Sequence, residues 1–357
     1  MGLSAYDVLV AAREHGFELA GIASVDSAAT DFPRYRDWVD QGYAGRMGYL
    51  TDHRADIRRD PRQLLPSVRS ILCVGKLYNR AIDSGSPGIA KYAQGEDYHH
   101  FMRRDLERMV ASLGEREAFE ARICVDTAPL LERSLARQAG LGWIGKNTCL
   151  INQQQGSWFL LAEVLLSLDL TPNAEPPPDR CGSCTRCIEA CPTQAIVPDA
   201  AGGWPDGADG WTLDASACIS YFTIELKGSI PEAYRSQMGN NIFGCDICQD
   251  VCPWNRRAPE TAAPEFFTIS GASLEDLLNL DAPRFRLQFE KTPVSRARYA
   301  GFLRNVLIAA GNSGDQRLRE PVRRILESAS EEIVREHASW ALARLDGRNP
   351  GSSGSER

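Results

Sequence analysis

The first 170 residues alternate between two hydrophobic patterns. Three continuous apolar runs are typical of buried strands, and two segments repeat apolar residues at helical spacing. In the longer helical segment Phe101, Leu106 and Leu113 would share one face. Alternation of this kind predicts an α/β domain with helices packed on a sheet. We expect strands at 70–78, 121–126 and 157–168, and helices at 97–114 and 128–140.

The pattern changes twice further along the chain. The proline-rich segment 169–180 cannot continue a helix or a central strand, so we expect a stiff linker before a cysteine-rich region. The later segments 295–314 and 319–345 repeat apolar, small and arginine positions, which predicts stacked helix pairs of the HEAT type. The fold class is therefore α+β multidomain. Its expected parts are an α/β domain at 1–170, a ferredoxin-like domain at 171–260, a HEAT-like helical domain at 261–345 and a disordered tail at 346–357.

Composition and charge restrict the possible functions. The chain has 357 residues, 43% of them hydrophobic, and a formal net charge of -7. A negatively charged protein is not a general nucleic-acid binder, so such a role would need a local basic face. No window approaches about 18 consecutive apolar residues, and the first residues predict an amphipathic helix rather than a secretion leader. We therefore expect a cytoplasmic protein with no membrane span.

The cysteines are the strongest chemical signal. Eight of the eleven lie between Cys181 and Cys252, and this clustering favours metal ligation over disulfides. The first four, with Pro192, match the ferredoxin spacing C-x2-C-x2-C-x3-C-P, in which three thiolates hold one [4Fe-4S] cluster and the fourth holds another. A second run before Pro253 lacks its first cysteine, and Cys218 is the nearby thiol that would replace it.

In this pattern the last cysteine of each run ligates the other cluster, and this rule assigns all eight thiolates. Zinc ribbons also use C-x2-C pairs, but seven of the eight thiolates and both prolines fit the ferredoxin pattern. Cys73, Cys124 and Cys149 lie in apolar stretches, where we expect buried core thiols. The expected ligands are Cys181, Cys184, Cys187 and Cys252 for the first cluster, and Cys218, Cys245, Cys248 and Cys191 for the second.

Nucleotide and corrinoid motifs are incomplete. The segment 140–147, GLGWIGKN, is close to a phosphate loop, but Asn147 replaces the required hydroxyl residue and the segment follows a helix instead of a strand. The same segment also spells G-x-G-x-x-G at Gly140, Gly142 and Gly145, but it follows a helix and not a strand, so it gives no support to a Rossmann NAD site. The motif D-x-H-x-x-G begins at Asp97 and His99, but Met102 replaces its glycine. A corrinoid bound here would therefore lack the usual axial histidine.

Asp126 is the candidate general acid. It ends the expected strand 121–126, and the carboxyl ends of strands in open α/β sheets face the ligand crevice. Partial burial there would raise its pKa and favour the protonated donor. The alternative is helix capping, because Asp and Thr before Pro129 are ordinary capping residues. Spacing alone favours capping.

Taken together, these segments resemble the epoxyqueuosine reductase family across almost the whole chain. That family removes the epoxide oxygen from epoxyqueuosine at the wobble position of tRNA, giving queuosine, and uses cobalamin and two [4Fe-4S] clusters. Motif order, spacing and domain order agree with the family. The resemblance rests on MGYL…HRADIRRDPRQLLPSVRSILCVG, KYAQGEDYHHFM, VDTAPLLERSLARQAGLGWIGKNTCLIN, and a cysteine region with CISYFTIE and FGCDICQDVCPWN.

The resemblance implies a role for each matched segment. The first domain would bind cobalamin over its sheet. The clusters would pass electrons singly from an external low-potential donor of the flavodoxin or ferredoxin type. Asp126 would protonate the departing oxygen. The residues implied to contact cobalamin are Tyr92, Tyr98, His99, Asp126, Asn152, Ser220 and Asp246.

The C-terminal segment is expected to bind the tRNA backbone. From Lys291 to Arg357 it has twelve Lys and Arg residues against eight Asp and Glu residues, an excess of positive charge in a negative chain. The residues that concentrate this charge are Arg296, Arg298, Arg304, Arg317, Arg319, Arg323 and Arg324.

Two other functions stay open at this point. A corrinoid reductive dehalogenase would share the cofactors but would normally carry a twin-arginine leader. A non-enzymatic ferredoxin-type electron-transfer adaptor would need the cysteine region but not the α/β domain before it. Cobalamin binding and activity on modified tRNA would separate these functions from epoxyqueuosine reduction.

Overall fold

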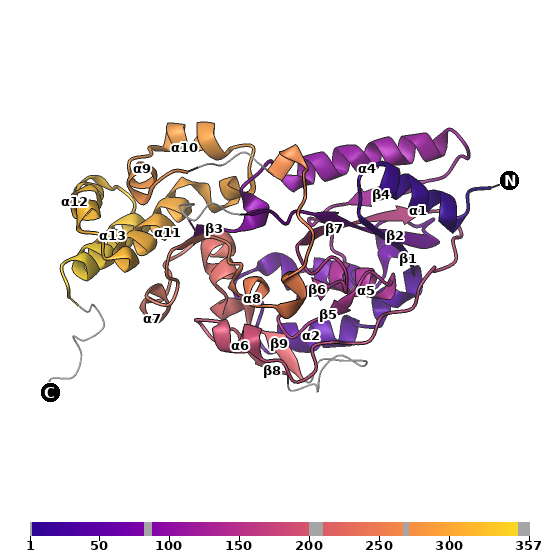
Figure 1. The fold of residues 1–357 in the computed structure, drawn as a ribbon, viewed down its shortest axis with the longest axis horizontal. Coiled ribbons are helices and arrows are strands. Elements are labelled where there is room, and N and C mark those ends of the chain that lie inside the picture. Colours follow the sequence, from indigo (N-terminus) through magenta and orange to yellow (C-terminus); the bar gives the residue numbers. More distant parts are fainter. Residues whose placement is uncertain (1, 82–87, 200–209, 267–270, 349–357) are drawn as a thin grey trace.

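The structure is a computed structural model, which describes residues 2–81, 88–199, 210–266 and 271–348 (Figure 1). Most of the predicted tail therefore lies outside the described residues. The α-helices are α1 (Ala5–Glu14), α2 (Phe32–Asp40), α3 (Arg54–Ile57), α4 (Tyr98–Gly114), α5 (Glu132–Gln138), α6 (Arg186–Ala190), α7 (Glu232–Arg235), α8 (Ile247–Asp250), α9 (Leu274–Leu278), α10 (Ala282–Phe289), α11 (Arg298–Ser313), α12 (Arg319–Ser328) and α13 (Glu332–Leu345). The strands are β1 (Leu19–Ser24), β2 (Ser70–Leu77), β3 (Gly88–Ile89), β4 (Ala121–Cys124), β5 (Trp143–Ile144), β6 (Leu150–Ile151), β7 (Phe159–Leu166), β8 (Ile196–Pro198), β9 (Trp211–Leu213) and β10 (Asn241–Phe243).

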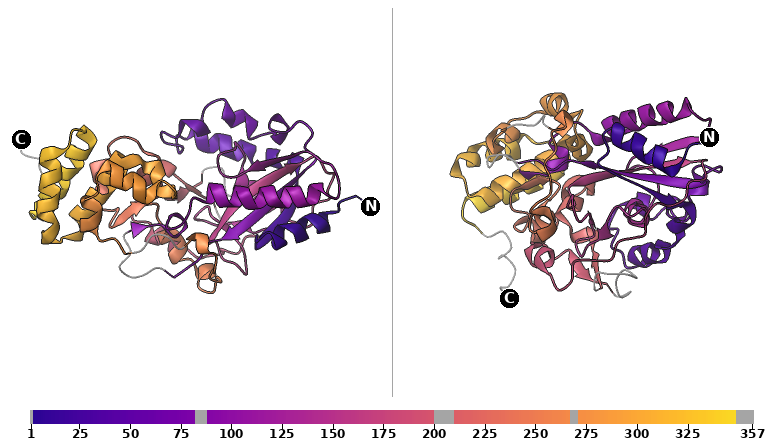
Figure 2. Two further views of the ribbon diagram at one scale, coloured as in Figure 1. Left: turned by 90° about the horizontal axis from the view of Figure 1, so that it is seen from above. Right: turned by 45° about the vertical axis from the view of Figure 1, so that its right-hand side comes forward.

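A four-stranded sheet in the order β1-β2-β7-β4 forms the centre of the N-terminal part. The three predicted apolar runs form β2, β4 and β7, so those strands are confirmed with slightly shorter bounds. The apolar faces of α1 and α4 cover one side of the sheet and α5 covers the other, as Figure 2 also shows. The mixed α and β composition of the prediction is thus confirmed.

The direction of the strands differs from the prediction. All three ladders of the sheet are antiparallel, so the rule that placed Asp126 at the carboxyl edge of a parallel sheet does not apply. An apolar run shows that a strand is buried but not which way it runs. The capping alternative is also wrong, because α5 begins at Glu132 with Leu131 as its N-cap. Pro129 disfavours helical backbone at residue 128, and the helix begins only at Glu132.

The cysteine-rich region contacts the N-terminal part through a short parallel pair of strands, β3 and β10. Gly88 makes this pairing possible, because a Cβ at this position would collide with the carbonyl of Asn240. Ile89 and Ala93 then belong to the same hydrophobic core as residues from 219 to 345. The core therefore crosses the predicted domain boundaries, which themselves stay predictions.

The C-terminal helices pack around α11, with α13 in contact with both α11 and α12. The single pattern predicted at 319–345 forms two helices, α12 and α13. Arg304 on α11 is only 1% exposed, and its guanidinium donates to the carbonyls of Phe222, Leu226 and Gly228. It pins α11 to the preceding region, so its predicted role at the tRNA surface is wrong.

Candidate active site

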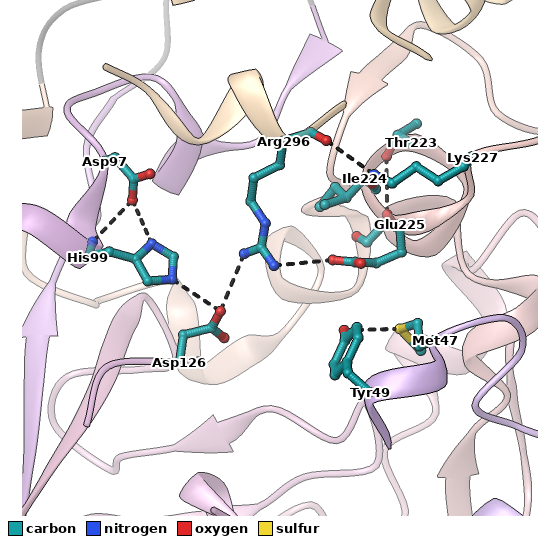
Figure 3. Close-up of polar contacts among 11 residues, drawn as sticks. Met47, Tyr49, Asp97, His99, Asp126, Thr223, Ile224, Glu225, Lys227 and Arg296 are labelled. Carbon is teal, nitrogen blue, oxygen red and sulfur yellow. Dashed lines mark hydrogen bonds and ion pairs between the residues drawn. The ribbon is translucent and has the colours of Figure 1, made fainter. Parts of the chain in front are cut away.

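Five charged residues form a row between the sheet and the C-terminal helices (Figure 3). His99 lies between two carboxylates: its Nδ1 is 2.6 Å from Asp97 Oδ1, and its Nε2 is 3.2 Å from Asp126 Oδ2. Arg296 comes next, with one terminal nitrogen 3.3 Å from Asp126 Oδ2 and the other 3.5 Å from Glu225 Oε1. Negative and positive groups therefore alternate along this set, which we call the charge row.

Backbone structure fixes the ends of the charge row. Asp97 is the N-cap of α4, and its side chain also accepts a hydrogen bond from the backbone N–H of His99. The N–H of Asp97 donates to the carbonyl of Lys291 at 2.8 Å, which holds the start of α4 beside the C-terminal part. Asp126 has a φ of 56°, and its N–H donates to Glu132 Oε1 at 2.9 Å. Positive φ is uncommon outside glycine, and such strain often marks functional loops.

The electrostatics of the row place the proton on His99. Burial alone would lower the pKa of His99, but its hydrogen bonds to Asp126 and Asp97 outweigh burial and raise the pKa to about 9. Burial alone would raise the pKa of Asp126, but the hydrogen bond from His99 and the charge of Arg296 bring it below the usual value of 3.8. The prediction of a raised pKa for Asp126 is therefore wrong. At neutral pH an imidazolium faces a carboxylate.

Two of the predicted cofactor contacts border this row. The ring of Tyr98 stacks on His99 with centroids 4.2 Å apart, and Tyr92 meets Tyr98 edge-on at 6.1 Å. Burial raises the pKa of both tyrosines, so their hydroxyls stay protonated. The charges of Arg296 and Asp126 also reach the hydroxyl of Tyr92. The structure thus brings Tyr92, Tyr98, His99 and Asp126 together, and their contact with cobalamin stays a prediction.

The other three predicted contacts have different surroundings. Asp246 accepts a hydrogen bond from the N–H of Lys91 at 2.7 Å, and burial raises its pKa to about 6. Ser220 hydrogen-bonds the thiol of Cys218, on the cysteine side of the site. Asn152 donates from its side-chain amide to the carbonyl of Leu141 and accepts from the N–H groups of Gln154 and Gln155 in its own loop. Its placement gives no connection to the charge row.

Four of the clustered cysteines form a first group. Burial, together with the charges of Cys252 and Cys184, raises the pKa of Cys187 to about 11, so these three thiols are close neighbours. Cys181 packs with Cys252 in a small apolar cluster. The group has the composition expected for the first iron-sulfur cluster.

The other four cysteines form a second group. Burial raises the pKa of Cys245 to about 12, and the charges of Cys218 and Cys191 contribute. The charges of Cys245 and Cys218 in turn act on Cys248. Cys218 therefore lies with the motif whose first cysteine is missing, although it is 27 residues away from Cys245 in the chain.

Among the described residues, no group of three or more His, Cys, Asp or Glu side chains is close enough to hold a single metal ion. The preference for two cubes over two zinc ions rests on the motif spacing and on the two prolines that follow the motifs.

The segment that resembles a phosphate loop lies against both cysteine groups. It forms the β5–β6 hairpin, in which Lys146 Nζ donates to the carbonyl of Gly182 at 2.6 Å and Asn147 Nδ2 to the carbonyl of Cys248 at 3.4 Å. Cys149, at the end of the segment, is partly exposed and hydrogen-bonds Cys248. The prediction of a buried core thiol is wrong for Cys149. It is confirmed for the other two cysteines outside the motifs.

Sequence analysis missed part of the site. It assigned Arg296 to the tRNA surface and did not single out Glu225 or Tyr49. Burial raises the pKa of Tyr49 to about 12, and the charges of Glu225, Arg296 and Asp126 all act on its hydroxyl. The available signal was their position, because Tyr49 is in MGYL and Glu225 in CISYFTIE, two segments that carried the resemblance.

Comparison with known proteins identifies the family. Residues 58–127 match the family model described as epoxyqueuosine reductase QueG, DUF1730, and residues 180–255 match a 4Fe-4S double cluster binding domain. The epoxyqueuosine reductase of Xanthomonas campestris pv. campestris is 40% identical over 93% of this chain and 93% of its own length. That of Vibrio cholerae is 38% identical over 93% of this chain and 89% of its own length. This chain belongs to the epoxyqueuosine reductase family.

Solved structures agree with this family. An epoxyqueuosine reductase with a tRNA-Tyr epoxyqueuosine-modified stem loop is 26% identical, with a TM-score of 0.85 over 95% of this chain and 89% of that chain. The epoxyqueuosine reductase of Streptococcus thermophilus is also 26% identical, with a TM-score of 0.83 over 99% of this chain and 95% of that chain. Membership of the family makes this chain an oxidoreductase and does not favour the dehalogenase or adaptor alternatives.

Among the described residues, no helix is both long enough and apolar enough to cross a membrane.

The grouping of the cysteines predicts the effect of removing Cys218, which is far along the chain from the motif that it completes. Cys218→Ala should lower the iron content from about eight to about four atoms per chain, because one cube loses a corner while the other keeps all its ligands. Iron and sulfide analysis of anaerobically purified protein measures this. Cys73→Ala is the matched control and should keep full iron content. Retention of all the iron by Cys218→Ala would contradict the grouping.

Proposed function

We propose that this chain reduces epoxyqueuosine to queuosine at the wobble position of tRNA, with cobalamin and two [4Fe-4S] clusters as cofactors. The observation that carries the proposal is the charge row, which presents a protonated His99 and an ionised Asp126 beside buried tyrosines and next to the cysteine groups. Epoxide opening generates an oxyanion, and a positioned proton donor is what this step requires.

The thiol groups fit the clusters. We assign Cys181, Cys184, Cys187 and Cys252 to the first cluster, and Cys218, Cys245, Cys248 and Cys191 to the second, because the side chains gather in these two sets. The β5–β6 hairpin covers both cluster loops and restricts the access of water. When bound, the clusters supply single electrons from an external low-potential donor of the flavodoxin or ferredoxin type.

The residues near the charge row also fit cobalamin. Tyr92, Tyr98 and Asp246 would contact the ring system, and Asn152 and Ser220 stay in the proposal on the family resemblance alone. When bound, cobalamin supplies a strongly reducing, nucleophilic centre for the epoxide carbon. His99 has both ring nitrogens engaged by carboxylates, so it is placed to hold a proton rather than to ligate cobalt.

Asp126 and His99 act together on the proton. His99 carries it, and Asp126 orients the imidazolium and stabilises its charge. An oxyanion that approaches Asp126 Oδ2 would receive the proton either from His99 directly or through this carboxyl group. Asp126 is thus still assigned as the group at the departing oxygen, but with His99 as the source of the proton.

Arg296 holds Asp126 in place from the C-terminal side. Its guanidinium bridges Asp126 and Glu225 and therefore stabilises the carboxylate form of both groups. The side chains of Arg296 and Asp126 are similarly exposed, at 36% and 37%, so an entering nucleoside could contact both. If Arg296 left Asp126 and bound the substrate instead, the pKa of Asp126 would rise, and Asp126 would transfer a proton more readily.

The first test compares isosteric variants of the acid pair. Asp126→Asn and His99→Gln keep the size of each side chain but remove the shared proton, so each should lower turnover by about 10²–10⁴-fold. The assay digests epoxyqueuosine-containing tRNA to nucleosides after anaerobic reaction with reductant and cobalamin. Asp105→Asn on the same helix, where Asp105 pairs with Arg104, is the matched control. Wild-type rates for both variants would end the acid assignment.

The same experiment tests the function itself. Wild-type protein should convert the epoxide nucleoside to queuosine, and failure to do so with both clusters loaded and cobalamin bound would contradict the proposed activity. Iron content and cobalamin binding, measured on each variant, separate loss of chemistry from loss of cofactor.

Exposed arginines of the C-terminal helices are proposed to contact tRNA phosphates. Arg317 pairs with Asp315 at 2.7 Å, and Arg323 pairs with Glu320 at 3.0 Å, so part of the predicted charge is neutralised locally. Arg298, at the start of α11, is exposed and has no ion pair among the described residues, and the same holds for Arg324 on α12. These two are the better candidates.

Charge reversal tests this surface. The double variant Arg298→Glu with Arg324→Glu should raise KM for tRNA about tenfold or more at low salt. The slope of log K for tRNA binding against log salt concentration should become shallower by about one unit for each phosphate that the variant no longer binds. Binding titrations at several salt concentrations measure this, with kcat at saturating tRNA unchanged. Arg13→Glu, on α1 at the other end of the molecule, is the control. Equal salt slopes for the double variant and wild type would place the tRNA elsewhere.

A further inference from the structure

Glu163 is a buried acid that the proposed mechanism has not used. It lies in the middle of β7, is 0% exposed, and neither carboxyl oxygen has a hydrogen-bond partner that meets normal geometry among the described residues. Burying an ionised carboxylate without a partner is costly, so such a group stays protonated or is removed by selection for stability. A central strand position normally holds an aliphatic residue.

The surroundings of Glu163 keep it neutral. It stands opposite Cys73 on β2 and Cys124 on β4, and α5 covers this face of the sheet. Burial raises the pKa of both thiols, so neither carries a charge at neutral pH. Burial and the charges of Glu132 and Asp126 raise the pKa of Glu163 well above its usual value, and no basic residue offsets them.

Glu132 connects this buried acid to the site. It begins α5, its Oε1 accepts the N–H of Asp126 at 2.9 Å, and its carboxyl group faces that of Glu163. Burial and the charge of Asp126 raise the pKa of Glu132 to about 8, and only Arg133 and His99 act in the opposite direction among charged groups. Two acids that hold their protons at neutral pH therefore lie directly behind Asp126.

The chemistry requires two protons where the charge row holds one. Conversion of an epoxide to an alkene breaks two carbon–oxygen bonds, forms one carbon–carbon double bond and releases the oxygen as water. Two electrons, from the external donor, and two protons balance this change. The first proton converts the oxyanion to a hydroxyl group, and the second allows that hydroxyl group to leave as water. His99 with Asp126 accounts for the first.

We propose that Glu163 and Glu132 form a buried proton reserve that recharges the Asp126–His99 pair for the second protonation. The proton passes from Glu132 to Asp126, Glu163 replaces it on Glu132, and solvent restores the pair after product release. This inference rests on the proposed function. It gives a role to a fully buried carboxyl group at the centre of a sheet.

The test separates proton supply from structural support. Glu163→Gln and Glu163→Leu should fold with both clusters and show a thermal midpoint equal to or above that of wild type, because each removes an unpartnered buried acid. Their kcat should fall about tenfold or more, with KM for tRNA unchanged. The infrared carbonyl band of a protonated carboxyl group, present in wild-type holoenzyme at pH 7, should lose intensity in both variants.

Glu18→Gln is the control, because Glu18, like Glu132, accepts a hydrogen bond from a backbone N–H, that of Leu77, but lies outside the row of acids. It should keep kcat and the infrared band. Wild-type kcat in Glu163→Gln, a parallel loss of stability and activity in both Glu163 variants, or no change in the infrared band would each overturn the proposal. An inactive wild-type holoenzyme would instead contradict the proposed function, and the inference with it.

Discussion

The ion pair between Arg296 and Asp126 joins the two halves of this protein at the place where the chemistry is proposed. One partner follows an edge strand of the antiparallel sheet, and the other precedes the first long C-terminal helix. Because Asp126 is ionised by Arg296 and His99, the imidazole is the group that keeps a proton. The site therefore depends on correct packing of segments 170 residues apart.

That packing is secured by interactions away from the site. The β3–β10 pair connects the N-terminal part to the cysteine-rich region. The hydrogen bond between the backbone of Asp97 and Lys291, and the buried guanidinium of Arg304, connect these parts to the C-terminal segment. This packing places Asp97 and Glu225 at opposite ends of the charge row. Weakening any one of these connections would move Arg296 relative to Asp126 and alter the pKa values of Asp126 and His99.

The sequence predicted the local features well. Strands β2, β4 and β7 and helix α4 follow from hydrophobic runs and helical periodicity, and the two cysteine groups follow from motif spacing. The direction of the strands does not follow from the sequence pattern, because an apolar run is the same in either direction. The ionisation state of Asp126 could not be predicted from the sequence either, because it depends on Arg296, and no local sequence pattern connects Arg296 to residue 126. Glu163 was hidden for a similar reason: within an apolar run, one acid gives no sign of whether it has a partner.

The central claim is that the proton for epoxide opening resides on His99 at neutral pH. The most direct test is the pH dependence of kcat/KM for epoxyqueuosine tRNA, since this profile reports the ionisation of the free enzyme. We expect the rate to stay high through neutral pH and to fall as pH rises through about 9, where His99 loses its proton. The His99→Gln variant should lack this fall. A rate that instead declines between about pH 4 and 7 would show that a carboxylic acid is the donor and would contradict the account.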